Sequence, residues 1–208
     1  MTIAALFVAA DGCYSGLPGV DPWPEARDAR TYAGPHPVVA HPPCQRWGRF
    51  WHGSPRKPHQ FEKGDDDGCF AAALASVRAW GGVLEHPACS HAWLAHGLPW
   101  PARSGWQRDM AGGWCCYVEQ GFYGHDGRKP TWLYAAHVDL PALRWGTGPQ
   151  KLDPEMVERL GYVKARRYGW SGLVGGKRKG EIRNATPPEF RDLLLSIAAT
   201  AQKLERAA

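Results

Sequence analysis

The sequence has no run of about 18 or more apolar residues, the length that a membrane-spanning helix needs. Its six cysteines include no Cys-x-x-Cys pair, which excludes the common zinc-finger spacings and argues against a disulfide framework. The nearest candidate ligands, His86, Cys89 and His91, have no second pair of ligands at a matching spacing, so we expect no bound metal. Met1 to Val8 has no basic leader and reads as a core strand. These absences predict a cytoplasmic protein without membrane contact.

The composition indicates one globular domain with a hydrophobic core, because 44% of the 208 residues are hydrophobic. The 11 tryptophans, 25 glycines and 18 prolines favour many loops and large aromatic contacts over a helical bundle. The formal net charge of +5 is compatible with a polyanionic partner but does not locate it. Nothing in the composition indicates the oligomeric state.

A buried strand is expected over Val38 to Ala40, shortly before Pro42-Pro43-Cys44. The strand must end there because proline has no N–H group for a sheet hydrogen bond. The Cys44 thiol therefore lies at the edge where α/β sheets bind ligands. A cysteine beside a strand is often a small buried hydrophobic residue, but a loop of Pro, Gln, Arg and Gly is poor core material.

A second short strand, Val83 to Leu84, ends in a similar way at Glu85-His86-Pro87. Two strand ends in one sheet can place the Glu85 carboxyl group beside the Cys44 thiol, over one pocket. Read alone, a glutamate near a strand end is more typical of a surface or cap position. The pairing of Cys44 with Glu85 is therefore a hypothesis that depends on the order of the strands.

Other elements follow from periodicity and capping residues. A strand over Ile3 to Ala10 leads into a turn with Gly12 and Gly16, which is typical of a cofactor site or of an ordinary tight turn. Further elements are a short helix from Glu25 to Tyr32, a helix over Phe70 to Trp80 capped by Asp65 to Asp67, strands over Trp114 to Gln120 and Thr131 to Ala136, and a helix from Asp153 to Gly161. The capping box Thr186-Pro-Pro-Glu189 predicts the start of the last helix.

Two segments concentrate positive charge among aromatic residues, at 45–68 and at 163–180. The second contains six Lys or Arg residues and no acid. Basic and aromatic side chains together suit phosphate contact and base stacking, although a solvated loop has the same composition. The DNA contacts that we expect are Gln45, Arg46, Arg49, Lys129, Lys177, Arg178 and Lys179.

Five motifs follow one another over nearly the whole chain. They are Leu6-Phe7 with Gly12, Gly16 and Leu17; Pro42-Pro43-Cys44-Gln45; Leu84-Glu85-His86-Pro87; Tyr123-Gly124 through Arg128-Lys129; and Asn184-Ala185-Thr186-Pro187-Pro188. In this order they resemble the cytosine-5 DNA methyltransferase family. The resemblance is to its opening cofactor motif, its catalytic loop, its Glu-Asn-Val motif, its basic motif and its closing Gly-Asn-x-x-Pro-Pro motif.

The resemblance implies an enzyme that activates carbon 5 of cytosine in DNA. Because that carbon is a poor nucleophile, the family adds a cysteine thiolate to carbon 6, and Cys44 would be this thiolate. Glu85 would bind ring nitrogen 3, which needs a carboxyl group that burial keeps protonated or sharing a proton. A cation, Arg128 or Lys129, would lower the thiol pKa and hold the base. The implied catalytic residues are thus Cys44, Glu85 and Arg128.

The resemblance also implies an α/β fold, with a reduced Rossmann-like methyltransferase sheet, flanking helices and a small basic insertion. The catalytic domain would comprise residues 1–136 and 182–208, and residues 137–181 would form a small target-recognition-like insertion. The methyl donor would be S-adenosylmethionine, and the target base would swing out of the duplex. The implied cofactor-binding residues are Phe7, Asp11, Gly12, Asp21, Pro42 and Asn184.

The cofactor side departs from the family pattern. Ala9 and Asp11 stand where the family has glycine, and Asp11 puts a carboxylate near the expected carboxylate of S-adenosylmethionine. Only 24 residues separate Leu17 from Pro42, too few for the usual pair of strands that hold the adenosine. Two alternatives therefore stay open. The same pyrimidine activation could serve another donor or a free nucleotide, or the chain could be an inactive relative that only binds DNA.

Overall fold

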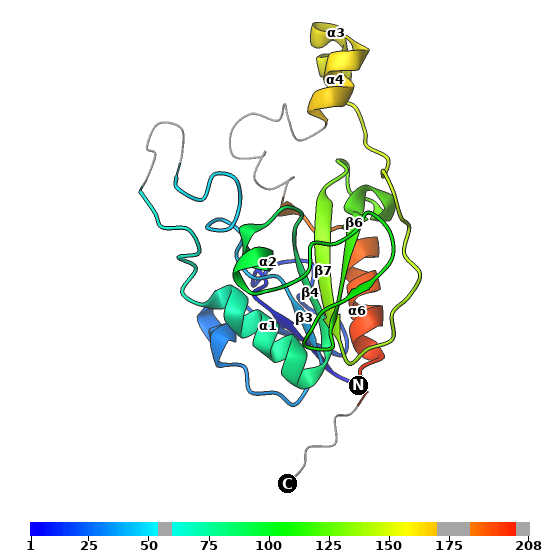
Figure 1. The fold of residues 1–208 in the computed structure, drawn as a ribbon. Coiled ribbons are helices and arrows are strands. Elements are labelled where there is room, and N and C mark those ends of the chain that lie inside the picture. The colour runs from blue at the N-terminus through cyan, green and yellow to red at the C-terminus, as the bar shows by residue number, and fades with distance from the viewer. Residues whose placement is uncertain (54–59, 170–183, 203–208) are drawn as a thin grey trace.

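The fold is described from a computed structural model, which covers residues 1–53, 60–169 and 184–202. Its centre is a seven-stranded mixed sheet of order β2-β1-β3-β4-β7-β6-β5 (Figure 1). The strands are β1 Ile3–Leu6, β2 Val20–Trp23, β3 Val38–Ala40, β4 Gly82–Pro87, β5 Gln107–Arg108, β6 Trp114–Glu119 and β7 Pro130–Ala136. Strands β2, β1, β3 and β4 are parallel, whereas β7, β6 and β5 join the sheet through antiparallel pairs.

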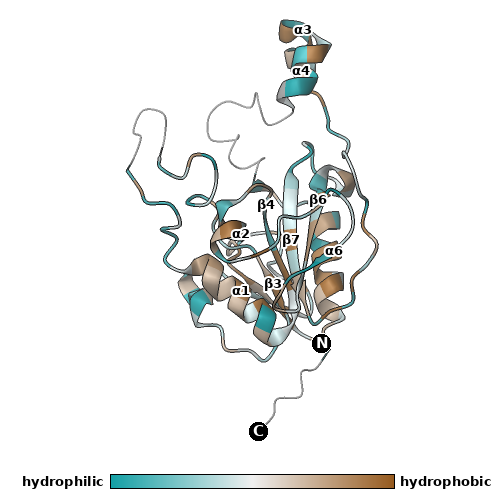
Figure 2. Cartoon of the chain, viewed as in Figure 1, coloured by the Kyte–Doolittle hydropathy of each residue, from teal (hydrophilic) through white to brown (hydrophobic). Residues whose placement is uncertain are grey.

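The sheet is buried on both faces, because successive strand residues point to opposite sides. In β1, Ala4 and Leu6 pack on one face and Ile3 and Ala5 on the other. Helix α1 (Cys69–Trp80) covers the first face, and helix α6 (Pro188–Ala199) covers the second. Figure 2 shows the apolar residues of the strands enclosed between these two helices. The expected α/β class with flanking helices is therefore confirmed.

The start of α1 is fixed by the carboxylate of Asp66, within the predicted Asp65 to Asp67 cap. Its oxygens accept hydrogen bonds from the backbone N–H groups of Gly68 (3.1 Å) and Phe70 (2.9 Å). The same buried carboxylate accepts a 2.7 Å hydrogen bond from Trp47 Nε1. Asp66 thus ties the loop that follows Cys44 to the first turn of α1.

Replacing Asp66 with alanine is expected to lower the free energy of unfolding by about 2 kcal/mol, because a helix cap is lost and a buried indole N–H is left without an acceptor. Urea unfolding measures this change. Asp65→Ala is the matched control, since Asp65 is exposed. Equal unfolding midpoints for the two variants would contradict the role given to Asp66.

Two local predictions are wrong. Helix α6 begins at Pro188 with Pro187 as its N-cap and without a side-chain cap, so Thr186 lies one residue too early to form the capping box. The expected helix over Glu25 to Tyr32 is instead a pair of 3₁₀ turns, η1 Glu25–Arg27 and η2 Ala29–Thr31. The turns are separated by Asp28, whose φ of 45° is left-handed. Its carboxylate accepts a hydrogen bond from the Arg30 backbone N–H, which starts the second turn.

The first crossover between parallel strands contains no helix. Parallel strands β1 and β2 are joined by residues 7–19, which form turns and no helix. Parallel neighbours usually need a connection of a dozen or more residues that contains a helix. No helix N-terminus therefore follows β1. The pair of strands that holds the adenosine in the family was expected to be missing, but one strand, β2, is present beside β1.

The segment after β7 divides into two parts. Leu143 packs into the core beneath α6, and the Gly148 N–H donates to the Glu119 carboxylate, so residues 137–151 belong with the sheet. Helices α3 (Pro154–Leu160) and α4 (Tyr162–Tyr168) follow and stand apart from the sheet in Figure 1. The α3 start agrees with the predicted Asp153 cap. Among the described residues, no helix is long and apolar enough to cross a membrane.

Candidate functional site

The order of the parallel strands opens a cleft at one edge of the sheet. From β1 the chain passes to β2 on one side and then returns to β3 on the other, so the connections diverge between β1 and β3. In open α/β sheets, ligands bind at such a switch point, beyond the carboxyl ends of the strands. A cleft of about 860 Å³ lies there, and its lining includes Phe7, Trp23, Glu25, Asp28, Arg30, Pro43, Gln45, Arg46 and Asp66.

Phe7, the first residue after β1, has a left-handed backbone with a φ of 58°. This conformation is rare for a bulky residue and costs free energy that the surroundings must offset. Such outliers cluster at ligand sites, and the Phe7 side chain lies on the cleft. The strained residue therefore marks the carboxyl end of β1 as part of the candidate site.

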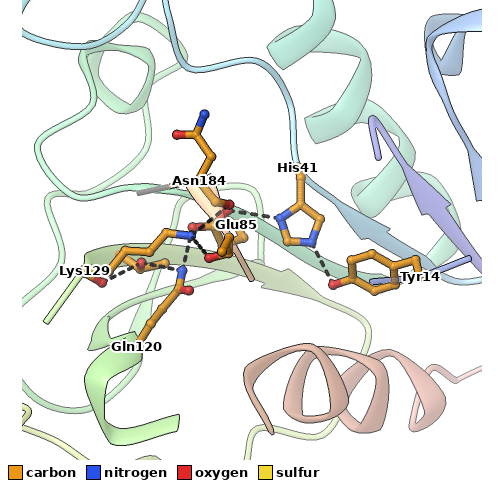
Figure 3. A network of polar contacts seen from close by, with 8 residues as sticks. Tyr14, His41, Glu85, Gln120, Lys129 and Asn184 are labelled. Atoms are coloured by element: carbon orange, nitrogen blue, oxygen red, sulfur yellow. Dashed lines mark hydrogen bonds and ion pairs between the residues drawn. The ribbon is translucent and has the colours of Figure 1, made fainter. Parts of the chain in front are cut away.

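A network of hydrogen bonds crosses the carboxyl ends of β3 and β4 (Figure 3). His41 Nδ1 lies 3.0 Å from Glu85 Oε2, and His41 Nε2 lies 2.8 Å from the hydroxyl of Tyr14. Gln120 Nε2 donates to Glu85 Oε1 at 3.1 Å and to Thr131 Oγ1 at 2.9 Å. Both carboxylate oxygens of Glu85 therefore already accept a hydrogen bond from the protein.

Lys129 brings a positive charge to the same place. Its Nζ donates to the carbonyl oxygens of Ala185 (2.7 Å) and Asn184 (3.3 Å), and its backbone is left-handed with a φ of 44°. Burial lowers the pKa of the ammonium group, while the charges of Glu85 and Cys44 act in the opposite direction. The Cys44 thiol, the Glu85 carboxylate and the Lys129 ammonium thus interact electrostatically around one point.

The charge of Glu85 differs from the expectation. Burial by itself raises the pKa of this carboxyl group, but the hydrogen bond from His41 and its charge outweigh burial, and Lys129 adds to them. The resulting pKa is about 2. Burial alone therefore does not decide the charge of Glu85, because the imidazole of His41 at 3.0 Å favours the ionised carboxylate.

The candidate nucleophile lies in the turn directly after β3. Cys44 is partly exposed, and its carbonyl oxygen accepts a hydrogen bond from the Trp47 N–H at 3.1 Å. The Trp47 indole is buried and held by Asp66, so the turn is anchored on the C-terminal side of the thiol. Arg128, the other proposed cation, is half-buried, and its Nε has no hydrogen-bond acceptor among the described residues.

The predicted cofactor residues are only partly brought together. Phe7 lines the cleft, and Pro42 is buried two residues after the end of β3. Asp11 is exposed in the turn with Gly12, and Asn184 contributes its backbone oxygen to Lys129. The Asp21 carboxylate accepts hydrogen bonds from Arg27 and Trp23, which hold its pKa below the usual range. Asp21 lies opposite Ala4 within β2, whereas Glu25 and Asp28 reach the cleft.

The predicted DNA contacts lie in different parts of the structure. Gln45 and Arg46 line the cleft, and the Arg46 guanidinium lies 3.4 Å from the centre of the Phe61 ring. Arg49 is exposed, and Lys129 belongs to the polar network. Lys177, Arg178 and Lys179 fall outside the described residues.

Three residues of the network were not predicted: Tyr14, His41 and Gln120. The sequence could have indicated His41 as a site residue, because this polar residue follows a buried strand and directly precedes two prolines. Gln120 stood at the end of an expected strand and Tyr14 within the glycine-bearing turn.

No protein-family model matches the chain, and neither the curated proteins nor the solved structures contain a match.

Proposed function

We propose that the protein is a DNA base-modifying enzyme that activates carbon 5 of cytosine through a thiolate of Cys44. The observation that carries this proposal is the electrostatic grouping of Cys44, Glu85 and Lys129 at one edge of the sheet, where β3 and β4 end and the antiparallel β7 begins. A buried ammonium group favours the thiolate over the thiol, and the thiolate is the nucleophile.

Each member of the group has a role in the reaction. The Cys44 sulfur bonds to carbon 6 of the ring, and the ring electrons shift toward nitrogen 3, where a proton held by Glu85 neutralises them. Carbon 5 of the resulting enamine then attacks an electrophile. The buried Nε of Arg128 offers an unused hydrogen-bond donor that suits the oxygen of a base or phosphate.

Methyl transfer from S-adenosylmethionine is the version of this function that we favour. The switch-point cleft supports it, because Phe7 provides an apolar surface while Glu25 provides a carboxylate for hydroxyl or cationic groups. The four parallel strands around that point agree with a reduced Rossmann-like methyltransferase sheet. DNA as substrate is supported by exposed Lys164, Arg166 and Arg167 on α4.

Two observations favour the alternatives. The helix-free connection from β1 to β2 offers no helix N-terminus for the carboxylate of S-adenosylmethionine, which favours another donor. Both oxygens of Glu85 are engaged by His41 and Gln120, which favours a relative that binds DNA without reacting. The experiment below separates these possibilities.

The test is mass spectrometry of nucleosides from random-sequence duplex DNA incubated with the purified protein and S-adenosylmethionine carrying a deuterated methyl group. Deuterated 5-methyldeoxycytidine is the expected product. A modified deoxycytidine in DNA from cells expressing the protein, without transfer of the label in vitro, would point to another donor. Unmodified DNA in both samples would refute an enzyme acting on DNA.

A further inference from the structure

His41 is placed to change the charge of Glu85, and this placement leads beyond the proposed roles of the thiol and the carboxylate. Its Nδ1 contacts one oxygen of Glu85 at 3.0 Å, and its Nε2 contacts the Tyr14 hydroxyl at 2.8 Å. The imidazole is mostly buried, with 14% of its side chain exposed, and the Tyr14 ring packs at 5.3 Å between ring centres. The imidazole is thus fixed between two partners on different segments.

The charge state of Glu85 creates a problem for the proposed reaction. Nitrogen 3 of neutral cytosine is a hydrogen-bond acceptor, and an ionised carboxylate is also acceptor-only. Two acceptors facing each other repel, so a proton must reach Glu85 before it can bind the ring. Gln120 donates an amide N–H that cannot be transferred, whereas a protonated His41 has a transferable proton.

We propose that His41 is a positioning residue that lends its proton to Glu85 when the pyrimidine binds and recovers it when the adduct breaks down. This inference rests on the proposed function. The His41 imidazolium transfers its Nδ1 proton to the Glu85 carboxylate, which gives a neutral imidazole and a carboxylic acid with no change in total charge. As the Cys44 sulfur bonds to carbon 6, the displaced electron pair of the ring takes that proton at nitrogen 3. Adduct breakdown reverses both transfers.

Three titratable groups face His41: Tyr14 from the β1–β2 connection, and Glu85 and His86 from β4. Other charges act on these partners: Lys129, from the start of β7, acts on Glu85, while Cys13 and Arg191 act on Tyr14. Glu85 attracts a proton, whereas Lys129 favours the ionised carboxylate. The balance makes the His41 and Glu85 pair a place where one proton can move between two adjacent atoms.

The test measures the rate of covalent adduct formation against pH, using random-sequence duplexes that contain 2-pyrimidinone. This base lacks the 4-amino group and is more electrophilic, so its adduct needs no methyl donor. The wild-type rate is expected to rise with pH as the thiolate forms and then fall as the His41–Glu85 pair loses its shared proton, which gives a bell-shaped profile. His41→Gln is expected to lose the falling limb and to be at least 10-fold slower at the wild-type maximum. His91→Gln, which changes an exposed histidine on α2 (His91–Ala95), is the matched control and should keep the bell.

A falling limb that survives in His41→Gln, or a rate lowered by one factor at every pH, would overturn the inference and leave the proposed function standing. Absence of any wild-type adduct would overturn both, which is a distinct result. If His41→Gln does not fold, nitrogen-15 NMR of the histidine ring in Cys44→Ser gives the answer. On binding the 2-pyrimidinone duplex, the His41 ring is expected to change from imidazolium to neutral imidazole, and an unchanged ring would overturn the inference.

Discussion

Replacing Cys44 with serine is expected to abolish the covalent adduct with DNA that contains 5-fluorocytosine in the presence of S-adenosylmethionine. The fluorine at carbon 5 cannot leave as a proton does, so the wild-type adduct persists and is detected as a shifted band on a denaturing gel. A serine hydroxyl is not ionised near neutral pH, and the neighbouring Lys129 cannot make it so. We expect a rate loss on the order of 10³-fold or more.

Cys89→Ser is the matched control, since Cys89 is exposed and has no place in the polar network. This variant should form the adduct at the wild-type rate. An adduct that forms in Cys44→Ser and disappears in a different cysteine variant would place the nucleophile elsewhere. Absence of the adduct in the wild type, together with measurable DNA binding, would support the inactive relative.

Glu85→Gln is expected to slow adduct formation on the order of 10²-fold, because an amide cannot pass a proton to the ring. The substitution keeps the shape of the side chain, so its partners His41 and Gln120 stay close. Glu119→Gln is the control for loss of a buried carboxylate, since Glu119 is equally buried but binds Tyr117 and Gly148 instead. Adduct rates that fall equally in both variants would contradict a chemical role for Glu85.

The same variant should change how stability depends on pH. The pKa of Glu85 is lowered from 4.5 to about 2 in the folded protein, so the unfolded chain binds the proton more readily. The resulting stability is fully present above about pH 4.5 and is lost as the pH falls toward 2. Urea unfolding of the wild type should therefore lose about 3 kcal/mol more over this window than Glu85→Gln. Parallel curves for the two proteins would contradict the charge assigned to Glu85.

Most strands with strong apolar patterns were predicted well, although β1 ends at Leu6 and not at the expected Ala10. Strand β3 forms over Val38–Ala40 as expected, and β6 and β7 differ from their predicted bounds by one residue. Strand β2 was missed because Val20-Asp-Pro-Trp23 has little β-propensity, and its proline is tolerated since β2 is an edge strand. Strand β5 has two residues, too few for any periodicity.

The sequence predicted part of the candidate site, namely the positions of Cys44 and Glu85. Cys44 and Glu85 each followed a short apolar run, and the parallel pairing of β3 with β4 brings both to one edge of the sheet. The expected end of the second strand was wrong, because β4 continues through Pro87 and Glu85 lies within it. The His41 contacts could not be predicted, because they depend on where the turn carrying Tyr14 lies relative to β3 and β4. The lowered pKa of Glu85 follows from those contacts, so it could not be predicted from burial alone.

The anchoring of Lys129 has a consequence for the order in which the protein is synthesised. Cys44 leaves the ribosome early, but Lys129, the cation that we propose to act on its thiol, is held by the backbone oxygens of Asn184 and Ala185. A nascent chain that has not yet reached these residues leaves Lys129 without its acceptors. Under the proposed function, a chain that ends before residue 185 is therefore expected to lack the activated thiol.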